Sequence, residues 1–354
     1  AWTYWAYFIK YRIGITSMRI YEHGGQIELF AKELDCKVED VIDLSSNINF
    51  IKPDVNIDFN NLDISSYPIY DKLYEKIADT YKISSSKLEL FNGGSSAIFA
   101  LFKHLNLKHC TIYSPAYLEY KKACVNFGYE LRTINRFENM NLPVKEKSFV
   151  IFVNPSTPDG TYYDIERLMD YWIEQNCTIL IDESFLDFCD GSSAIKYLEK
   201  YDKLYILKSM TKFYSSAGIR VGTIVSNEKN IDSLKRFEPM WKLSTFDSNY
   251  LQASLDDKNF KRISKAINVK NRVELERILE NSSIVESIYQ SSANYVLVKL
   301  KNIRAKQLQE KLKPFKIMIR NCENFDFLDD TYVRIAVKSS SNIEVFKKAL
   351  EKIC

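Results

Sequence analysis

The sequence predicts an α/β protein with a large lobe built on a mostly parallel sheet and a second, smaller α+β lobe. Between about residues 87 and 225, short apolar runs alternate with amphipathic stretches, which is the pattern of parallel α/β units. The runs FVIFV and TILI are almost continuously apolar, as strands buried on both faces require. The chain has 354 residues, 46% of them hydrophobic, which is enough for about two cores.

The element order follows from apolar periodicity. In the large lobe we predict strands at 87–91, 110–113, 149–153, 178–181, 204–207 and 221–225, and helices at 95–104, 118–127 and 165–175. A long helical stretch at 248–280 is expected to bridge the lobes. Beyond it we predict strands at 287–290, 295–300, 316–320 and 332–337, and helices at 305–312 and 343–352.

We divide the chain into four parts: 1–17, 18–60, 61–255 and 256–354. The first part precedes Met18 and is expected to be an extension outside the fold, the alternative being an interfacial or packing arm. The second packs with the small domain, the third is the large domain, and the fourth is the small domain.

Composition excludes several classes of protein. The formal charge is only +3, and basic and acidic residues are mixed along the chain, so neither nucleic acid nor a membrane is an expected partner. The seven cysteines are scattered without a CxxC pair and there are three histidines, so no metal site is expected. A reducing cytoplasm suits this use of cysteine.

Glycine is rare, and its positions are informative. Of 10 glycines, seven fall in four short segments near 24–25, 93–94, 160 and 218–222. The segment Asn92-Gly-Gly-Ser-Ser96 lies between a predicted strand and a predicted helix, where backbone N–H groups and the helix dipole favour an anion. Ser209, Thr211 and Arg220 could complete that cradle. An ordinary strand-to-helix turn is the alternative.

Lys212 and Asp182 suggest a specific cofactor chemistry. Both follow apolar runs, so both are expected at the carboxyl edge of a parallel sheet, where open α/β folds bind ligands. A lysine that forms a Schiff base and an aspartate that keeps a pyridine nitrogen protonated are together what pyridoxal phosphate requires. Taken singly, a solvated loop lysine and a helix-capping aspartate remain alternatives.

Taken in order, these motifs resemble a known family. They are Ser114-Pro-Ala-Tyr117, Asn154-Pro-Ser-Thr-Pro-Asp-Gly160, Asp182-Glu-Ser-Phe185, Ser209-x-Thr-Lys212 and Arg220. The chain is similar, from about residue 23 to 340, to fold-type I pyridoxal-phosphate enzymes of the class I/II aminotransferase family, in the histidinol-phosphate aminotransferase branch. Within that branch it most resembles the threonine-phosphate and serine-phosphate decarboxylases, through His23-Gly-Gly, Ser46-Asn-Ile-Asn49 and Ile319-Arg-Asn-Cys322.

The resemblance implies the fold-type I architecture, with a mostly parallel seven-stranded sheet in the large domain, and pyridoxal 5'-phosphate as cofactor. It gives Lys212 the covalent bond to the cofactor, with Lys212 or Tyr214 as the acid that protonates the product. The implied cofactor-binding residues are Gly94, Ser95, Tyr117, Thr157, Asp182, Ser209, Thr211, Lys212 and Arg220, with Tyr67 from a neighbouring subunit of a homodimer. The implied substrate-binding residues are His23, Asn47, Arg320 and Arg334.

Two positions bear on the reaction. Phe185 stands where aminotransferases usually carry a tyrosine, and Thr157 replaces the usual asparagine that donates to the phenolic oxygen of the cofactor. The resemblance therefore favours decarboxylation of an O-phospho amino acid, either L-threonine phosphate to aminopropanol phosphate for cobalamin or L-serine phosphate to ethanolamine phosphate. The alternatives are an aminotransferase of the histidinol-phosphate type and a non-catalytic binding module with the same fold.

Overall fold

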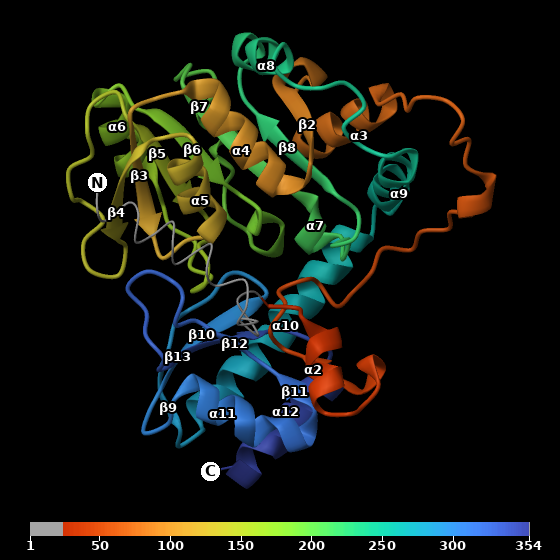
Figure 1. The fold of residues 1–354 in the computed structure, drawn as a ribbon, viewed down its shortest axis with the longest axis vertical. Coiled ribbons are helices and arrows are strands. Elements are labelled where there is room, and N and C mark those ends of the chain that lie inside the picture. The colour runs from red at the N-terminus through yellow and green to blue at the C-terminus, as the bar shows by residue number, and fades with distance from the viewer. Residues whose placement is uncertain (1–23, 354) are drawn as a thin grey trace.

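A sheet of seven strands forms the centre of the large lobe in the computed structural model, which describes residues 24–353 (Figure 1). Its strand order is β2-β8-β7-β6-β5-β3-β4, and all neighbours pair in parallel except β8, which is antiparallel to both β7 and β2. The strands are β2 Leu88–Asn92, β3 His109–Ser114, β4 Glu130–Asn135, β5 Phe149–Val153, β6 Thr178–Asp182, β7 Leu204–Ser209 and β8 Val221–Val225. The predicted mostly parallel seven-stranded sheet is confirmed.

Both faces of this sheet are covered. Along β5, Phe149 and Ile151 belong to one buried cluster, whereas Val150 and Phe152 belong to another on the opposite face. This alternation follows from the two-residue period of a strand. The helices of the lobe are α3 Asp71–Tyr81, α4 Gly93–Leu105, α5 Leu118–Asn126, α6 Glu166–Glu174, α7 Met210–Phe213, α8 Glu228–Lys235 and α9 Thr245–Asp256.

The predicted bridging helix is two helices. Helix α9 ends at Asp256, and α10 spans Phe260–Glu280 and runs down to the small lobe (Figure 1). The side chain of Asp257 accepts hydrogen bonds from the backbone N–H groups of Asn259 (3.2 Å) and Phe260 (3.0 Å). An aspartate that bonds to nearby N–H groups competes with continuous helix, so the break lies at this residue.

The small lobe contains a four-stranded antiparallel sheet in the order β12-β13-β10-β9. Its strands are β9 Val285–Ile288, β10 Tyr295–Leu300, β12 Arg320–Asn321 and β13 Tyr332–Ala336. The helices packed in this lobe are α2 Ile27–Glu33, α10, α11 Ala305–Leu312 and α12 Ser340–Ile353. The strand predicted at 316–320 is divided between β12 and β11 Ile317–Met318, which pairs in parallel with β1 Ile42–Asp43.

After β1, residues 45–48 run between the lobes and are held by their backbone. The carbonyl oxygen of Ser45 accepts from Arg334 (3.0 Å), that of Asn47 from Asn294 (2.8 Å), and that of Ile48 from Lys338 (3.2 Å). All three donors come from the small lobe. The N-terminal segment therefore contributes to the small lobe before the chain enters the large one.

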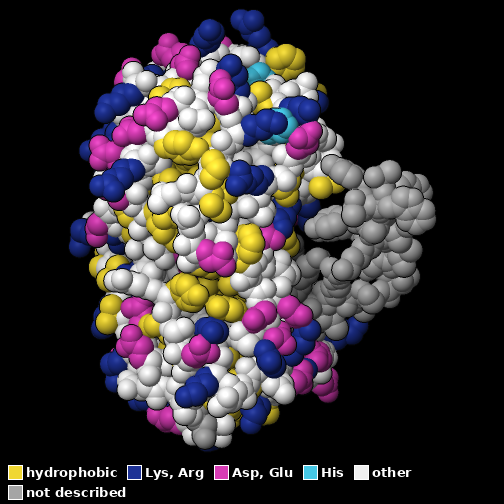
Figure 2. All heavy atoms as spheres, turned by 90° about the vertical axis from the view of Figure 1, so that its left-hand side faces the viewer, with side chains coloured by type: hydrophobic (Ala, Val, Ile, Leu, Met, Phe, Trp, Pro, Cys, Tyr) yellow, Lys and Arg dark blue, Asp and Glu magenta, His cyan; other side chains and the backbone are white. Residues whose placement is uncertain are grey.

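The surface agrees with the mixed charge of the sequence. On the face drawn in Figure 2, Lys and Arg side chains are interspersed with Asp and Glu, and hydrophobic side chains occur in small groups between them. Within residues 24–353, no helix is long and apolar enough to cross a membrane.

Candidate active site

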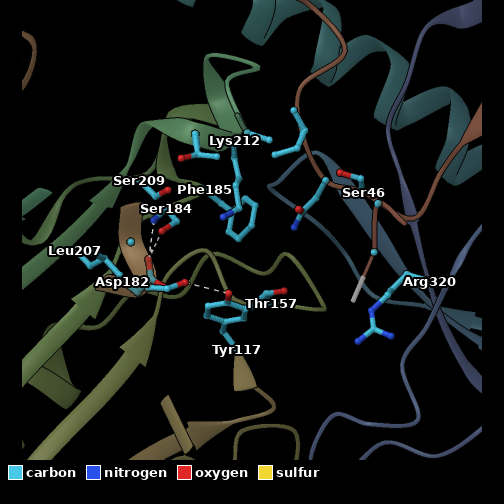
Figure 3. A pocket seen from close by; sticks show the side chains of 18 of the residues that line it. Ser46, Tyr117, Thr157, Asp182, Ser184, Phe185, Leu207, Ser209, Lys212 and Arg320 are labelled. Carbon is cyan, nitrogen blue, oxygen red and sulfur yellow. Dashed lines mark hydrogen bonds between the residues drawn. The ribbon is translucent and has the colours of Figure 1, made fainter. Parts of the chain in front are cut away.

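A cavity of about 370 Å³ lies between the lobes, at the carboxyl ends of the parallel strands. Asp182 is the last residue of β6 and Ser209 is the last residue of β7, and both line it. Arg320 enters the cavity from the small lobe, on the side opposite Asp182 and Ser209 (Figure 3). The position at the strand ends is the usual one for ligands in open α/β sheets.

Lys212 comes from the short helix α7, directly after β7, and its side chain extends into the cavity toward Phe185 (Figure 3). Burial lowers the pKa of its amine; the negative charge of Asp182 opposes this effect, and Arg220 and Arg334 reinforce it. A lowered pKa increases the fraction of neutral amine, which is the nucleophilic form. Lys212 therefore has the environment of a reactive lysine.

The backbone of the lysine helix is fixed by a residue from the N-terminal segment. Asn49 is buried, its N–H donates to the carbonyl oxygen of Lys212 (3.0 Å), and its side-chain amide donates to that of Phe213 (2.7 Å). The same amide donates to Ser264 in α10 (2.6 Å). Asn49 thus joins the lysine helix to the helix that bridges the lobes.

Three hydrogen bonds fix the carboxylate of Asp182. Oδ1 accepts from the backbone N–H (2.9 Å) and the hydroxyl (2.5 Å) of Ser184, and Oδ2 accepts from the hydroxyl of Tyr120 (2.6 Å). Burial and the adjacent Asp182 charge raise the pKa of Tyr120, so it stays a donor. A carboxylate offers about four acceptor positions, which leaves one on Oδ2 for a protonated ring nitrogen.

The glycine segment forms a narrow turn against Arg220. Gly93 has φ +81°, and a Cβ added there would lie 2.4 Å from the Arg220 guanidinium. A Cβ on Gly222 would lie 2.6 Å from the backbone nitrogen of Gly94. Only glycine fits at either position. The turn opens helix α4, so its free N–H groups and Arg220 meet at one edge of the cavity.

The remaining cofactor candidates surround this turn. Ser95 and Tyr117 lie with their hydroxyls 3.2 Å apart, and both line the cavity, as do Ser209, Thr211 and Thr157 (Figure 3). The hydroxyl of Thr211 is buried without a hydrogen-bond partner among the described residues. An unsatisfied buried hydroxyl at an anion-binding turn indicates a missing acceptor, and a phosphate oxygen would satisfy it.

Arg320 and Arg334 are register partners on the antiparallel strands β12 and β13. Both are buried and both line the cavity. Arg334 donates to the carbonyl oxygen of Ser45 (3.0 Å) and, more weakly, to the hydroxyl of Thr157 (3.4 Å), while its Nε has no partner in the described structure. Arg320 donates to Oδ1 of Asn324 (2.6 Å). Like charges that face each other across strands are unfavourable, so the pair favours a bound anion.

Of the four remaining predicted residues, one lines the cavity, two lie away from it, and one is outside the described residues. Asn47 lines the cavity, whereas His23 lies outside the described residues. Tyr67 does not line the cavity; it is 71% exposed and stacks on Trp241 with ring centroids 4.1 Å apart. Tyr214 also lies away from the cavity, in the core, where its ring packs on Phe213 and on α10. Of the two candidate acids, Lys212 lines the cavity and Tyr214 does not.

The sequence reasoning missed Tyr120 and Ser184. Ser184 follows Asp182 by two residues, a spacing at which an aspartate often accepts from the backbone, so it could have been found. Tyr120 is 62 positions away from Asp182 in the chain. Its only signal is the spacing of three from Tyr117; in the structure the two rings meet edge to face with centroids 6.4 Å apart.

The residues present fit pyridoxal phosphate. The glycine turn with Arg220, Ser209 and the unpartnered Thr211 hydroxyl suits its phosphate. Asp182 has an acceptor position left for its ring nitrogen, and the amine of Lys212 lies in the same cavity. When bound, this cofactor supplies an aldehyde carbon for an amine and a ring that accepts electrons from a bond to Cα.

Known proteins of similar sequence include a cobalamin biosynthesis protein, aminotransferases and decarboxylases. The chain is 28% identical to the adenosylcobalamin biosynthesis bifunctional protein CobDQ of Leptospira interrogans over 91% of its length, but it spans only 40% of that protein. It is 26% identical to histidinol-phosphate aminotransferase of Methanocaldococcus jannaschii, covering 99% of both chains. It is 24% identical to threonine-phosphate decarboxylase of Salmonella typhimurium, covering 94% of this chain and 96% of that one.

Solved structures share the fold. Histidinol-phosphate aminotransferase from Clostridium acetobutylicum matches with a TM-score of 0.78 and 28% identity over 88% of this chain and 99% of that one. The enzyme of the same name from Sinorhizobium meliloti, solved with pyridoxal 5'-phosphate, matches with a TM-score of 0.75 and 14% identity over 96% and 100% of the two chains. A family model described as aminotransferase class I and II matches residues 39–353. The chain belongs to this family of fold-type I enzymes, which depend on pyridoxal phosphate.

Proposed function

We propose that the chain decarboxylates an O-phospho amino acid, L-serine phosphate or L-threonine phosphate, to carbon dioxide and the corresponding amine phosphate. The observation that carries this proposal is the facing pair Arg320 and Arg334 in the cavity that holds Lys212. Similarity to enzymes of both the decarboxylase and the aminotransferase kind supports a small amino-acid or phosphorylated substrate.

The charges of the cavity support a substrate with more than one negative group. Its lining contains Lys212 and three arginines, against the single carboxylate of Asp182. Arg220 lies at the glycine turn, where it would meet the cofactor phosphate. Arg320 and Arg334 then remain for the substrate, and arginine is well suited to both phosphate and carboxylate. A phospho amino acid carries both groups.

The chain's own residues would select the bond that breaks. The substrate phosphate and carboxylate, held by the two arginines, fix the orientation of the bonds at Cα. Decarboxylation requires the Cα–carboxylate bond to stand perpendicular to the cofactor ring, and binding energy from the remote phosphate can impose that orientation. After carbon dioxide leaves, Cα needs a proton, and the proposed donor is the protonated form of Lys212, which lines the cavity.

Two positions favour decarboxylation over transamination. Phe185 lines the cavity without a hydroxyl group, and its ring meets that of Tyr295 edge to face at 5.0 Å. The hydroxyl of Thr157 lies next to Arg334. The protein therefore offers the phenolic oxygen of the cofactor fewer donors than the tyrosine and asparagine usual in aminotransferases. This difference of electronic environment supports a reaction other than transamination.

Product analysis tests the proposal. The cofactor-loaded enzyme is incubated with phosphoserine or phosphothreonine, without any keto acid, and carbon dioxide and the amine phosphate are measured. Formation of both supports the proposal and identifies the substrate. Turnover that occurs only with 2-oxoglutarate would instead establish the aminotransferase. Full activity of Lys212→Ala, or pure protein with no cofactor absorbance that borohydride changes, would overturn the cofactor chemistry assigned to this cavity.

The proposal includes a homodimer in which Tyr67 reaches the partner's cofactor. The later part of the segment between β1 and α3, which includes Phe59–Asn61, forms an arm that projects from the body of the molecule (Figure 1). Large hydrophobic side chains are exposed on this arm and on the segment its Tyr67 contacts, namely Phe59, Ile64, Tyr67, Ile69, Phe237 and Met240. Exposed apolar groups of this kind mark interaction surfaces. The wild type should sediment as a dimer, and Ile69→Asp should sediment as a monomer that retains the cofactor less tightly. A wild type that sediments as a monomer would overturn this assembly.

A cytoplasmic location also belongs to the proposal. The described cysteines, Cys36, Cys110, Cys124, Cys177, Cys189 and Cys322, are all free thiols. Thiols that persist unpaired suit a reducing compartment. Fractionation of cells that express the full chain would test this location.

A further inference from the structure

Residues 321–326, which begin at the last residue of β12, surround Arg320. NH2 of Arg320 donates to Oδ1 of Asn324 (2.6 Å), and NH1 donates to the carbonyl oxygen of Asn321 (2.5 Å). The guanidinium carbon lies 5.3 Å from the centre of the Phe325 ring, which itself lines the cavity. The conformation of this loop therefore determines where the Arg320 guanidinium points.

Within the residues that the structure describes, one ion pair connects this loop to the large lobe. Asp326 pairs with Lys121 of helix α5. The two side chains are only 21% and 24% exposed, so this pair is less screened by solvent than a fully exposed one. Helix α5 begins directly after Tyr117, which lines the cofactor side of the cavity. The pair thus links the element that carries Tyr117 to the loop that holds Arg320.

Neighbouring charges have partners of their own. On α5, Lys122 pairs with Glu119 within the same helix at 2.7 Å. In the loop, Glu323 pairs with Lys306 of the small lobe at 2.9 Å. Among these pairs, only Lys121–Asp326 crosses between the lobes.

We propose that Lys121 and Asp326 are positioning residues that fix Arg320 for the anionic group of the substrate. The inference rests on the proposed function, because it takes Arg320 as a substrate-binding residue. Immobilising a flexible arginine costs conformational entropy, and a loop that is already fastened reduces the part of that cost incurred on binding. Breaking the ion pair should weaken substrate binding while leaving the chemical step unchanged.

Kinetics of the cofactor-loaded enzyme test this assignment. Lys121→Met and Asp326→Asn should each raise KM for the phospho amino acid by roughly 3- to 10-fold with kcat within about twofold, and the double variant should be no worse than either single one. The exchanged pair Lys121→Asp with Asp326→Lys should recover most of the loss. Lys306→Met is the matched control, because it removes an ion pair to the same loop from within the small lobe. A KM of Lys121→Met equal to that of Lys306→Met overturns the proposal.

Hydrogen exchange separates this inference from the proposed function. In the cofactor-loaded enzyme without substrate, backbone amides of residues 322–328 should exchange faster in Lys121→Met than in Lys306→Met, and the exchanged pair should restore their protection. Equal exchange rates in Lys121→Met and Lys306→Met would show that the Lys121–Asp326 pair does not hold the loop, whichever substrate the enzyme uses. If the wild-type enzyme turns over neither phospho amino acid, the proposed function fails, while faster exchange in Lys121→Met still supports the fastening of the loop.

Discussion

Tyr120 has no exposed surface, and its hydroxyl donates a hydrogen bond of 2.6 Å to Oδ2 of Asp182. Removing this donor leaves a buried carboxylate with one partner fewer. Hydrogen bonds to charged groups contribute about 1.5–3 kcal/mol, so we expect Tyr120→Phe to lower the free energy of unfolding of the cofactor-free protein by about that amount. Chemical denaturation followed by circular dichroism measures this change.

Tyr197→Phe is the matched control for Tyr120→Phe. Tyr197 is also buried, but its hydroxyl has no hydrogen-bond partner among the described residues. Its removal should leave stability unchanged or slightly increased, since no bond is lost. Equal losses in the two variants would show that the carboxylate does not depend on Tyr120.

The glycine turn gives a second prediction. An alanine at position 222 would place its Cβ 2.6 Å from the nitrogen of Gly94 and 2.7 Å from the carbonyl carbon of Gly93. Because both are backbone atoms of the turn that we propose to bind the cofactor phosphate, Gly222→Ala should reduce the affinity for pyridoxal phosphate by roughly 10- to 100-fold. Titration of the cofactor-free protein by absorbance measures the affinity. Gly218→Ala, where a Cβ meets nothing within 4 Å, should bind like the wild type.

The buried amine of Lys212 predicts a pH-dependent stability. Its pKa is lowered in the folded protein and returns to the usual 10.5 on unfolding, so between the two values the unfolded chain binds more protons and this group's contribution to stability rises with pH. Below the lowered pKa the buried ammonium destabilises the fold. Cofactor-free Lys212→Met should therefore melt at a higher temperature than the wild type at neutral pH, and the difference should close as the pH approaches 10.5.

Thermal unfolding between pH 7 and 10 measures that difference. Lys306→Met, which removes a largely exposed lysine, should not melt at a higher temperature than the wild type at neutral pH. A Lys212→Met difference that stays constant over this range would contradict the lowered pKa.

The facing arginines predict stabilisation by an anion. In the cofactor-loaded enzyme, inorganic phosphate should raise Tm, because an anion relieves the repulsion between Arg320 and Arg334, and at 100 times its Kd a ligand stabilises by about 2.7 kcal/mol. Arg320→Met should lose most of the shift. Arg236→Met removes an exposed arginine that does not line the cavity and should keep it. Equal shifts in the two variants would place the phosphate elsewhere.

Strands whose sequences are continuously apolar could be predicted, whereas a strand with exposed, mixed residues could not. The strand at 149–153 has the predicted bounds because every residue in it is buried. Strand β4 was missed because it lies at the edge of the sheet and Glu130, Leu131 and Arg132 are exposed. Its place depends on pairing with β3, which local periodicity does not contain.

The candidate site shows the same division between local and long-range information. Asp182 ends a strand, Lys212 and the glycine turn come shortly after strands, and the sheet brings all three to one edge. Tyr214 was placed near the chemistry because it is close to Lys212 in sequence, yet apolar packing against Phe260 draws its ring into the core. Adjacency in sequence does not specify the direction of a side chain.

The way residues 45–48 are held has a consequence for how this protein can evolve. The small lobe binds the carbonyl oxygens of Ser45, Asn47 and Ile48, so these bonds do not depend on the side chains of Ser46, Asn47 and Ile48. Ser46, Asn47 and Ile48 all face the cavity. Substitutions at these three positions can therefore alter substrate preference while the scaffold stays intact, which makes this short segment a natural place for new specificities to arise.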